Sequence, residues 1–435
     1  MGCRTRVALL RHADRLVAPG KSFEVATDPR AELKSFPKRG RSDRDVVSEI
    51  DRLRAISNIS QADRRLTGEF ARRSLDELEK VVDHALLAFN DSVLGFSNRG
   101  PERMEREVIS MLGSLWNNKN GESAGMVTSG GTEANLTALY AAISRRDKEF
   151  SGKSGSRGSV VLSSAAHPSV FKALRWLGLR PVIVRCRAND FTLDARHVEK
   201  SIRTDTVAIV ANCGVWPWGT VDPIPELGEI AEKRSLFLHV DAAWSGLLFP
   251  WLSKLGYDIP KFGFEAKGVS SISGSPDKMG FSIYPTGAIV FKDEKLFEPV
   301  HWSSGDYSTP GLPGTRAASL VATTWAIFEH LGEQGYKELA KTCMDLTLET
   351  AREIERIEGL ELPLEPMMNV LTFSSKSIDM SSVKSKLRKR GWHFFSMDGR
   401  THTLQNNISI VLVPYHSKVI PDFLSDLKRI VRDCR

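Results

Sequence analysis

The chain has 435 residues, of which 41% are hydrophobic and 26% are charged, a composition typical of a globular protein with one large and one smaller domain. The net charge of +7 is concentrated near the N-terminus, because residues 1–57 carry +5 and the remaining 378 residues carry only +2. This distribution argues against a nucleic-acid-binding face on the folded body. No apolar run approaches the roughly 20 residues that span a bilayer, so we expect neither a nucleic-acid partner nor a membrane span.

The cysteines are odd in number, scattered and without CxxC spacing. Such usage predicts reduced thiols in a soluble cytoplasmic protein rather than a disulfide framework or a zinc site. We therefore predict a cytoplasmic location and no bound metal. The five cysteines are Cys3, Cys186, Cys213, Cys343 and Cys434.

The N-terminal region is predicted to be mostly helical after an extended start. Residues 1–40 are rich in arginine and only weakly periodic, which indicates an extended arm. A serine and two aspartates then begin a helix that ends near Ala55, so we assign the arm and this helix to residues 1–65. Apolar residues at helical spacing predict two further helices, over 75–87 and 104–116.

From residue 159 onward, short β-rich runs alternate with helical stretches. This alternation predicts βαβ units, and hence an α/β fold with a mostly parallel sheet covered on both faces. In such sheets, ligands bind at the carboxyl ends of the strands. The predicted strands are 159–163, 181–185, 207–211 and 236–240, and the predicted helices are 168–177, 195–202 and 224–233.

A Gly/Pro-rich section, residues 305–314, marks the exit from this large domain, which we assign to residues 66–314. Residues 315–435 are predicted to form a smaller C-terminal α/β domain. Its predicted strands are 370–374 and 408–413, and its predicted helices are 317–331, 335–357, 381–390 and 419–432.

Two predicted strand ends present a carboxylate and a lysine. The strand that begins at Leu236 ends on Asp241, and a second β-rich run from Val269 leads through a Gly/Pro/Ser turn to Lys278. This pair meets the needs of a pyridoxal 5′-phosphate (PLP) site. The lysine holds the aldehyde as a Schiff base, and the carboxylate keeps the pyridine nitrogen protonated. The simpler alternative is a strand-end aspartate and an ordinary surface lysine.

Three further segments carry polar residues next to predicted helices or turns. Gly130, Gly131 and Thr132 stand directly before a helix, where free N–H groups and a hydroxyl would form a phosphate cup. The alternative is a glycine turn with a threonine cap. His167 either stacks on a flat cofactor or caps the helix that follows it, and Arg316 either binds an anion or pairs with an acid.

Taken together, these segments resemble the fold-type I PLP enzymes of the group II decarboxylase family. That family includes archaeal-type tyrosine/aspartate decarboxylases, glutamate decarboxylase and sphingosine phosphate lyase. The resemblance extends from about Phe36 to the C-terminus. Its most specific parts, found in family order, are Thr128-Ser129-Gly130-Gly131-Thr132-Glu133-Ala134-Asn135, His239-Val240-Asp241-Ala242-Ala243-Trp244, the segment around Lys278, and Gly314-Thr315-Arg316.

The resemblance implies a role for each residue around the cofactor ring. Lys278 binds the aldehyde covalently, and Asp241 pairs with the pyridinium nitrogen. His167 stacks on one face of the ring, while Ala243 lies against the other face. The implied activity is that of a carbon–carbon lyase acting on a small amino compound.

The resemblance also implies phosphate ligands and an oligomeric state. Gly130, Gly131 and Thr132 would hold the phosphate of the cofactor. Tyr307 corresponds to a loop tyrosine of the lyase branch and would reach the site of a neighbouring subunit. The family is dimeric, with its sites at the interface, so we expect a homodimer.

Two positions beside Lys278 depart from the family pattern. The family usually has a histidine immediately before the lysine and an aspartate three positions before it, whereas this chain has Asp277 and Ser275. An acid beside a bound phosphate is electrostatically unfavourable unless a cation or backbone donors offset it. We therefore expect Asp277 to turn away from the phosphate, or the site to be altered.

The substrate pocket combines features of two branches of the family. Ser409 stands where decarboxylases carry an arginine for the α-carboxylate, which favours the lyase branch. The loop over residues 279–287 has decarboxylase-branch length and lacks the lysine of the lyase branch, and Trp216 and Trp218 fill a loop that is usually rich in threonine. We place an amino-acid decarboxylase first, an aldehyde-lyase acting on an amino-alcohol or its phosphate ester second, and a catalytically weakened family member third.

Overall fold

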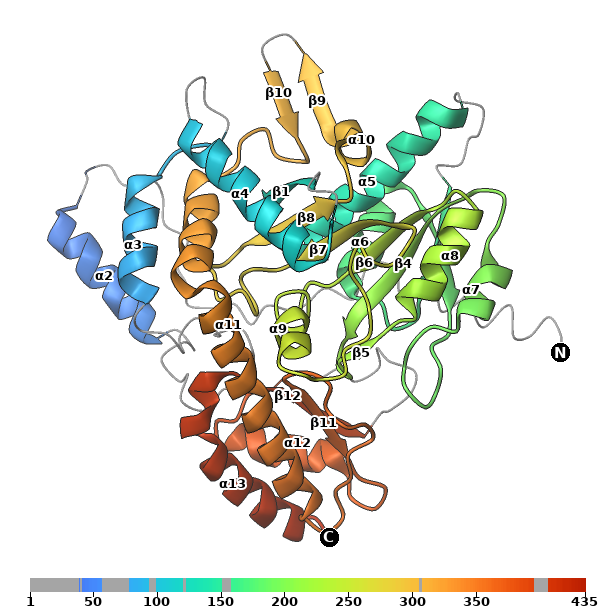
Figure 1. Cartoon of the computed structure of the whole chain (residues 1–435). Coiled ribbons are helices and arrows are strands. Elements are labelled where there is room, and N and C mark those ends of the chain that lie inside the picture. Colours follow the sequence, from blue (N-terminus) through green and yellow to red (C-terminus); the bar gives the residue numbers. More distant parts are fainter. Residues whose placement is uncertain are drawn as a thin grey trace.

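The computed structural model describes residues 39, 41–56, 78–93, 99–119, 123–150, 158–304, 307–394 and 406–435. A large body with a central sheet is followed by a smaller C-terminal unit with its own two-stranded sheet (Figure 1). The N-terminal arm predicted over 1–40 lies almost entirely outside the described residues. The helix predicted after it is confirmed as α2 (Asp43–Ile56).

The central sheet has eight strands and is mostly parallel, as predicted. The strands are β1 (Ala124–Thr128), β2 (Ser159–Ser163), β3 (Arg180–Val184), β4 (Thr206–Val215), β5 (Thr220–Val221), β6 (Phe237–Asp241), β7 (Val269–Gly274) and β8 (Gly287–Phe291). Their order is β1-β8-β7-β6-β4-β2-β3, with β5 paired to β4. Strands β3, β2, β4, β6 and β7 run parallel, whereas β8 is antiparallel to both of its neighbours. The carboxyl ends of β6 and β7 therefore lie side by side.

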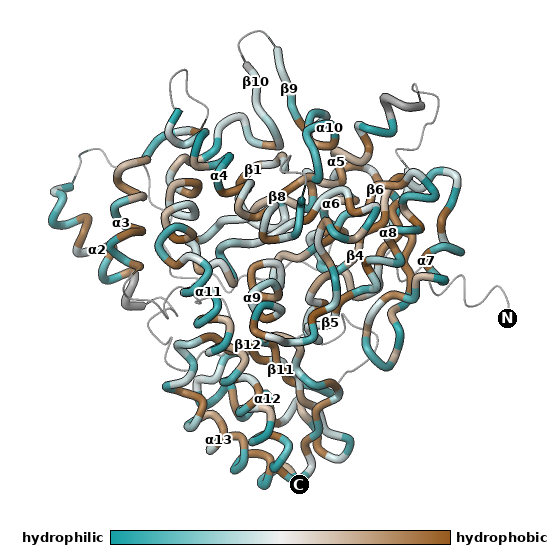
Figure 2. The backbone as a smooth tube through the Cα atoms, viewed as in Figure 1, coloured by the Kyte–Doolittle hydropathy of each residue, from teal (hydrophilic) through white to brown (hydrophobic). Residues whose placement is uncertain are grey.

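Helices cover both faces of this sheet. They are α4 (Arg99–Leu115), α5 (Gly131–Phe150), α6 (Pro168–Leu177), α7 (Ala195–Ser201), α8 (Ile224–Lys233), α9 (Phe249–Lys254) and α10 (Glu294–Phe297). In β2, Val160 and Leu162 pack in the hydrophobic cluster with α5 and α6, whereas Val161 packs in the cluster with α4, α7, α8 and α9. Side chains alternate between the faces of a strand, so both faces are buried and the strand is apolar throughout. Figure 2 shows this concentration of hydrophobic residues in the central strands.

A long helix, α11 (Ala318–Glu355), links the large body to the C-terminal unit. It packs against α3 (Leu78–Ala88) and α4 and then against the C-terminal strands. We predicted two helices here, and the structure has two helical segments that meet at a kink at Gly332, whose φ of 54° is not helical. Because glycine adopts positive φ at little cost, the chain bends there without a loop.

The C-terminal unit has a hydrophobic core of its own. Its elements are β11 (Val370–Ser374), α12 (Met380–Lys389), β12 (Asn407–Val411) and α13 (Ile420–Arg432). Phe373, Trp392 and Phe423 are fully buried in that core. The smaller α/β unit is thus present, while the proposed boundaries at 65 and 314 stay predictions.

The Gly/Pro-rich section was expected to be a loop, and this was wrong in part. Strands β9 (His301–Ser304) and β10 (Tyr307–Pro310) pair antiparallel and form a ribbon that projects from the body (Figure 1). Tryptophan, tyrosine and threonine in these strands favour extended backbone, and the neighbouring glycines and prolines obscured that tendency in the sequence.

Two observations bear on the predicted absences. Among the described residues, no helix combines the length and hydropathy needed to cross a membrane. The same part of the chain holds no group of three or more His, Cys, Asp or Glu side chains arranged to bind a metal. Four of the cysteines are free thiols, and Cys3 lies outside the described residues; the four are Cys186, Cys213, Cys343 and Cys434.

Candidate active site

Three elements bring the predicted site residues to one edge of the sheet. Asp241 is the last residue of β6, and its register partner in the adjacent parallel strand β7 is Ser273. Lys278 follows β7 after a short turn, and Gly131 begins α5 directly after β1 and a two-residue turn. The carboxylate, the lysine and the glycine turn therefore meet where α/β sheets bind their ligands.

The carboxylate of Asp241 is buried, with 8% of the residue exposed, and is held by three donors. Its Oδ2 accepts a hydrogen bond from Asn135 Nδ2 at 2.8 Å. Its Oδ1 accepts from the backbone N–H of Ala243 at 3.1 Å and from Ser273 Oγ at 3.4 Å. The orientation of this carboxylate is thus fixed by residues of β6, β7 and α5.

Asn135 is the centre of this network. Its Oδ1 accepts from Ser273 Oγ at 2.8 Å and lies 2.9 Å from His239 Nε2, while its Nδ2 also donates to Ser169 Oγ at 3.0 Å. An amide oxygen only accepts, so His239 carries its proton on Nε2. Burial lowers the pKa of His239 to about 4, although Asp241 raises it, so the ring is neutral. Sequence reasoning quoted Asn135 within a motif but missed this role.

Lys278 is not an ordinary surface lysine, so that alternative was wrong. Burial lowers the pKa of its ammonium group, although the charges of Asp241 and Asp277 raise it. Its Nζ lies 5.1 Å from the centroid of the Trp244 ring. A lowered pKa favours the neutral amine, which is the nucleophilic form.

The turn before α5 leaves open space at Gly130, whereas Gly131 lies close to Ala243. Gly130 has a φ of +114°, and a Cβ placed on it would meet no heavy atom within 4 Å. A Cβ on Gly131 would lie 3.2 Å from Ala243 Cβ and 3.6 Å from Ser275 Oγ. Thr132 is exposed at the helix start. An open cradle of free N–H groups beside a half-buried lysine fits a phosphate-bearing aldehyde such as PLP.

His167 is linked to the same network. It is the N-cap of α6, where its Nδ1 accepts from the backbone N–H of Ser169 at 3.2 Å and lies 2.7 Å from Ser169 Oγ. Ser169 Oγ also accepts from Asn135, which holds Asp241. The capping interpretation is thus confirmed, and His167 nevertheless remains exposed to solvent at the site.

Asp277 has turned one oxygen to the backbone. Its Oδ2 accepts from the N–H of Thr286 at 3.0 Å, and its own N–H donates to the carbonyl of Thr286 at 3.2 Å. Burial raises the pKa of Asp277, although the nearby Ser275 hydroxyl, the Thr286 N–H and the charge of Lys278 lower it. The departures from the family pattern at 275 and 277 thus contact each other.

Arg316 pairs with an acid, as one of its two alternatives predicted. Its guanidinium donates to both oxygens of Glu105, to Oε2 at 2.9 Å, and to the carbonyl of Val127 at 3.1 Å. Both side chains are buried, so this ion pair fixes α4 and β1 to the start of α11. Tyr307 begins β10, but its side chain lies outside the described part of the chain.

Tryptophans form a wall beside the lysine. The Trp216 and Trp244 rings lie 5.5 Å apart, and Trp244 Nε1 donates to Asn369 Oδ1 at 3.3 Å. Trp218 is buried and stacks on Phe191 with the ring centroids 4.0 Å apart. Trp216 is therefore the one of the two predicted loop tryptophans that contacts the Lys278 surroundings, while Trp218 is a core residue.

Position 409 faces the same loop from the C-terminal unit. Ser409 Oγ lies 2.9 Å from Thr372 Oγ1, and Thr372 donates to the carbonyl of Pro217 at 2.7 Å. Ser409 is 2% exposed. At the position where decarboxylases carry an arginine, this chain thus has a buried pair of hydroxyl groups, those of Ser409 and Thr372.

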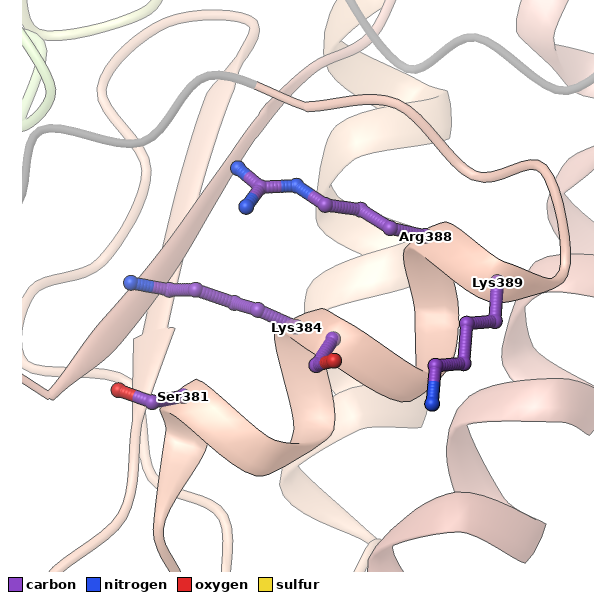
Figure 3. A pocket seen from close by; sticks show the side chains of 5 residues that line it. Ser381, Lys384, Arg388 and Lys389 are labelled. Carbon is purple, nitrogen blue, oxygen red and sulfur yellow. The ribbon is translucent and has the colours of Figure 1, made fainter.

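A separate cavity of about 420 Å³ lies on α12 of the C-terminal unit. Figure 3 shows that Lys384 and Arg388 extend to the same side of this helix, whereas Lys389 points elsewhere. The cavity shares no lining residue with the predicted site. Its lining residues are Ser381, Lys384, Ser385, Arg388 and Lys389.

A largely parallel sheet, a lysine after one strand, a carboxylate at the end of the next and a glycine turn opening a helix together define a fold-type I PLP-dependent enzyme. Residues 100–376 match the conserved domain of the pyridoxal-dependent decarboxylases. The chain belongs to this family.

Similar proteins are found in both the decarboxylase and the lyase branch of the family. The chain is 32% identical over 405 residues to the L-aspartate decarboxylase of Thermococcus kodakarensis, covering 91% of this chain and 99% of that protein. It is 32% identical over 336 residues to the sphingosine-1-phosphate lyase of Oryza sativa, covering 75% of this chain and 60% of that protein. Among solved structures, the Burkholderia pseudomallei sphingosine-1-phosphate lyase superposes with a TM-score of 0.84 at 25% identity, covering 95% of both chains.

Proposed function

We propose that this PLP-dependent lyase is an amino-acid decarboxylase, which releases carbon dioxide and leaves an amine. The main support is the pairing of a desolvated lysine, Lys278, with a buried and oriented carboxylate, Asp241, at adjacent strand ends. The archaeal relatives, named aspartate decarboxylases, match nearly the whole chain and favour the decarboxylase over the lyase.

The residues present would hold the cofactor as follows. When bound, PLP supplies an electron sink for the bond that breaks. Lys278 would offer a neutral amine to the aldehyde, and Asp241 would hold a proton at the pyridine nitrogen. His167 and Ala243 would flank the ring. The N–H groups of Gly130 and Gly131 and the hydroxyl of Thr132 would bind the phosphate.

The network beneath Asp241 keeps this carboxylate in one orientation. Asn135 donates to it, and the neutral His239 holds Asn135. Because His239 stays uncharged, it does not compete with the pyridine nitrogen for the negative charge of Asp241. Asp241 is therefore free to balance a protonated ring.

A homodimer in the cytoplasm is part of the same proposal. The β9–β10 ribbon projects away from the body, and Trp302 on it is 63% exposed (Figure 1). A partner subunit would cover this surface, and Tyr307 of one subunit would reach the site of the other. The free thiols support a reducing compartment.

An aldehyde-lyase acting on an amino-alcohol or its phosphate ester is the second candidate. Ser409 and Thr372 occupy the place of the arginine that would bind an α-carboxylate. A bidentate guanidinium is difficult to replace with two hydroxyls, so this observation favours a substrate that lacks that carboxylate.

One experiment separates these candidates. Purified protein loaded with PLP is given a panel of acidic and aromatic L-amino acids and amino-alcohol phosphates, and both carbon dioxide and aldehyde are measured. We expect carbon dioxide from at least one amino acid and neither product from Lys278→Ala. Aldehyde alone would establish the second candidate. Neither product from protein that carries the cofactor on Lys278 would establish a catalytically weakened member.

A further inference from the structure

Asp277 has a buried carboxylate oxygen without a hydrogen-bond partner. Only 6% of the residue is exposed, and while Oδ2 accepts from Thr286, Oδ1 has no partner. Leaving a buried carboxylate oxygen unpaired is costly when the group is charged. This part of the site is therefore incomplete in the protein alone.

Two separate chains of contacts link Asp277 to the glycine turn before α5. Through its own turn, Asp277 contacts Ser275, whose Oγ would lie 3.6 Å from a Cβ on Gly131. Through its hydrogen bond to Thr286, it is tied to the next residue, Gly287, which packs so closely on Gly130 that no side chain fits between them. Asp277 is thus linked to Gly131 through Ser275 and to Gly130 through Thr286 and Gly287.

A negative charge on the Asp277 carboxylate is only partly balanced by its neighbours. Lys278 is the charged group that acts on this carboxyl, while Ser275 and Thr286 contribute neutral donors. Lys278 is itself shared with Asp241, and burial lowers its own pKa. Once Lys278 is neutral, an ionised Asp277 would face a phosphate dianion with no cation between them among these residues.

We propose that Asp277 takes up a proton when the phosphate group of the cofactor occupies the cup, so that cofactor binding weakens as the pH rises. The proton removes a negative charge and gives Oδ1 a hydrogen to donate. One proton enters from solvent for each phosphate group bound and leaves with it. This inference rests on the proposed function, because it takes PLP as the ligand of the cup.

Pyridoxine 5′-phosphate is a suitable probe, because it carries the phosphate but has no aldehyde to react with Lys278. Its Kd and its heats of binding in buffers of different ionisation enthalpy are measured between about pH 7 and about pH 9, where the phosphate is mostly dianionic. For the wild type we expect the Kd to rise by up to about tenfold per pH unit above the pKa of Asp277. We also expect uptake of up to one proton per ligand at the higher pH.

Two variants give the comparison. Asp277→Asn removes the titrating carboxyl with little change of shape, so its Kd should depend less steeply on pH than that of the wild type and should be lower at high pH. The dependence that remains would come from the ring nitrogen of the probe, which Asp241 would keep protonated in both proteins. Asp258→Asn, at an exposed aspartate, should keep the wild-type dependence. If Asp277→Asn retains the wild-type slope, the inference is overturned. If that variant does not fold, the heat of binding of inorganic phosphate, which has no ring nitrogen, decides in its place, and binding without proton uptake overturns the inference.

Covalent attachment distinguishes this inference from the proposed function. PLP is added at several pH values, reduced with borohydride and located by mass spectrometry. Label on Lys278 together with a pH-independent Kd for pyridoxine 5′-phosphate would overturn only the role of Asp277. Absence of label at every pH would overturn the proposed function itself.

Discussion

The two halves of the site differ in how far the protein completes them. Around Asp241, Asn135 uses both of its amide hydrogens and its oxygen, and both ring nitrogens of His239 have partners. Around Lys278, Asp277 has an unpaired oxygen, and the space beside Gly130 is open. The half around Asp241, here the fixed half, is closed by hydrogen bonds within the protein. The half around Lys278 and Gly130, here the reactive half, is left for a ligand to complete.

This difference indicates how the work is divided between protein and cofactor. The group that must stay in one orientation throughout a reaction is fixed by folding, at the end of a buried strand. The groups that must exchange partners, Lys278 and Asp277, are desolvated, and Asp277 keeps one oxygen unpaired.

The largest effect is expected at the reactive half. Lys278→Ala should lower turnover by on the order of 10³-fold or more, because no other group replaces the amine that binds the aldehyde. Borohydride reduction and mass spectrometry should find no cofactor on the variant. Its thermal unfolding should resemble that of the wild type, because burial already disfavours the charged lysine.

Lys254→Ala is the matched control. Its Nζ lies 5.0 Å from the Trp251 ring centroid, much like the 5.1 Å between Lys278 and Trp244, but it pairs with Glu333 away from the site. This variant should keep both turnover and label. Label found on Lys278→Ala at the wild-type level would show that another amine holds the cofactor.

The next effect is expected at the fixed half. Asp241→Asn keeps the shape of the side chain but removes the charge that keeps the ring nitrogen protonated. Turnover should fall by about 10²-fold to 10³-fold, while the label on Lys278 persists. Turnover near the wild-type level would remove Asp241 from the mechanism.

Local patterns were sufficient to predict much of this fold. The strand over residues 159–163 and the helix over 168–177 were predicted at their true ends. Both ends of that helix carry clear capping residues, since His167 caps its N-terminus and Gly178, with a φ of 68°, ends it. Strand β4 runs further than predicted, because a mixed run of Asn212 to Val215 is held by pairing with β5 rather than by apolar residues.

The candidate site was predicted only as far as its motif residues. Lys278, Asp241 and the glycine turn stand at element ends, where position alone indicates a ligand. The bonds of Asn135 join three elements that are far apart in sequence, and no periodicity encodes such contacts. The antiparallel direction of β8 is likewise a property of the whole sheet.

The third effect concerns stability and is expected from His239. Burial lowers its pKa to about 4 in the folded protein, below the value of about 6.5 in the unfolded chain. Between these values the unfolded state binds more protons, so the contribution of His239 is present above about pH 6.5 and is lost as the pH falls to about 4. The loss amounts to about 3 kcal/mol.

Urea unfolding of the wild type and of His239→Gln, measured across that pH range, gives the test. The variant does not titrate at this position, so the difference between the two unfolding free energies should shrink as the pH falls. Asp222, whose pKa burial raises to about 6, titrates in both proteins and cancels in the difference. Parallel curves would show that folding does not lower the pKa of His239.

The smallest effect is expected at Gly131, in the reactive half of the site. A Cβ on Gly131 would lie between Ala243 and Ser275 and narrow the phosphate cup, so Gly131→Ala should weaken PLP binding by about tenfold, or about 1.4 kcal/mol. Gly100→Ala is the control, since it also adds a methyl in the first turn of a helix but meets only Phe89 at 3.6 Å. Equal PLP affinity in both variants, measured by absorbance titration, would show that the cup lies elsewhere.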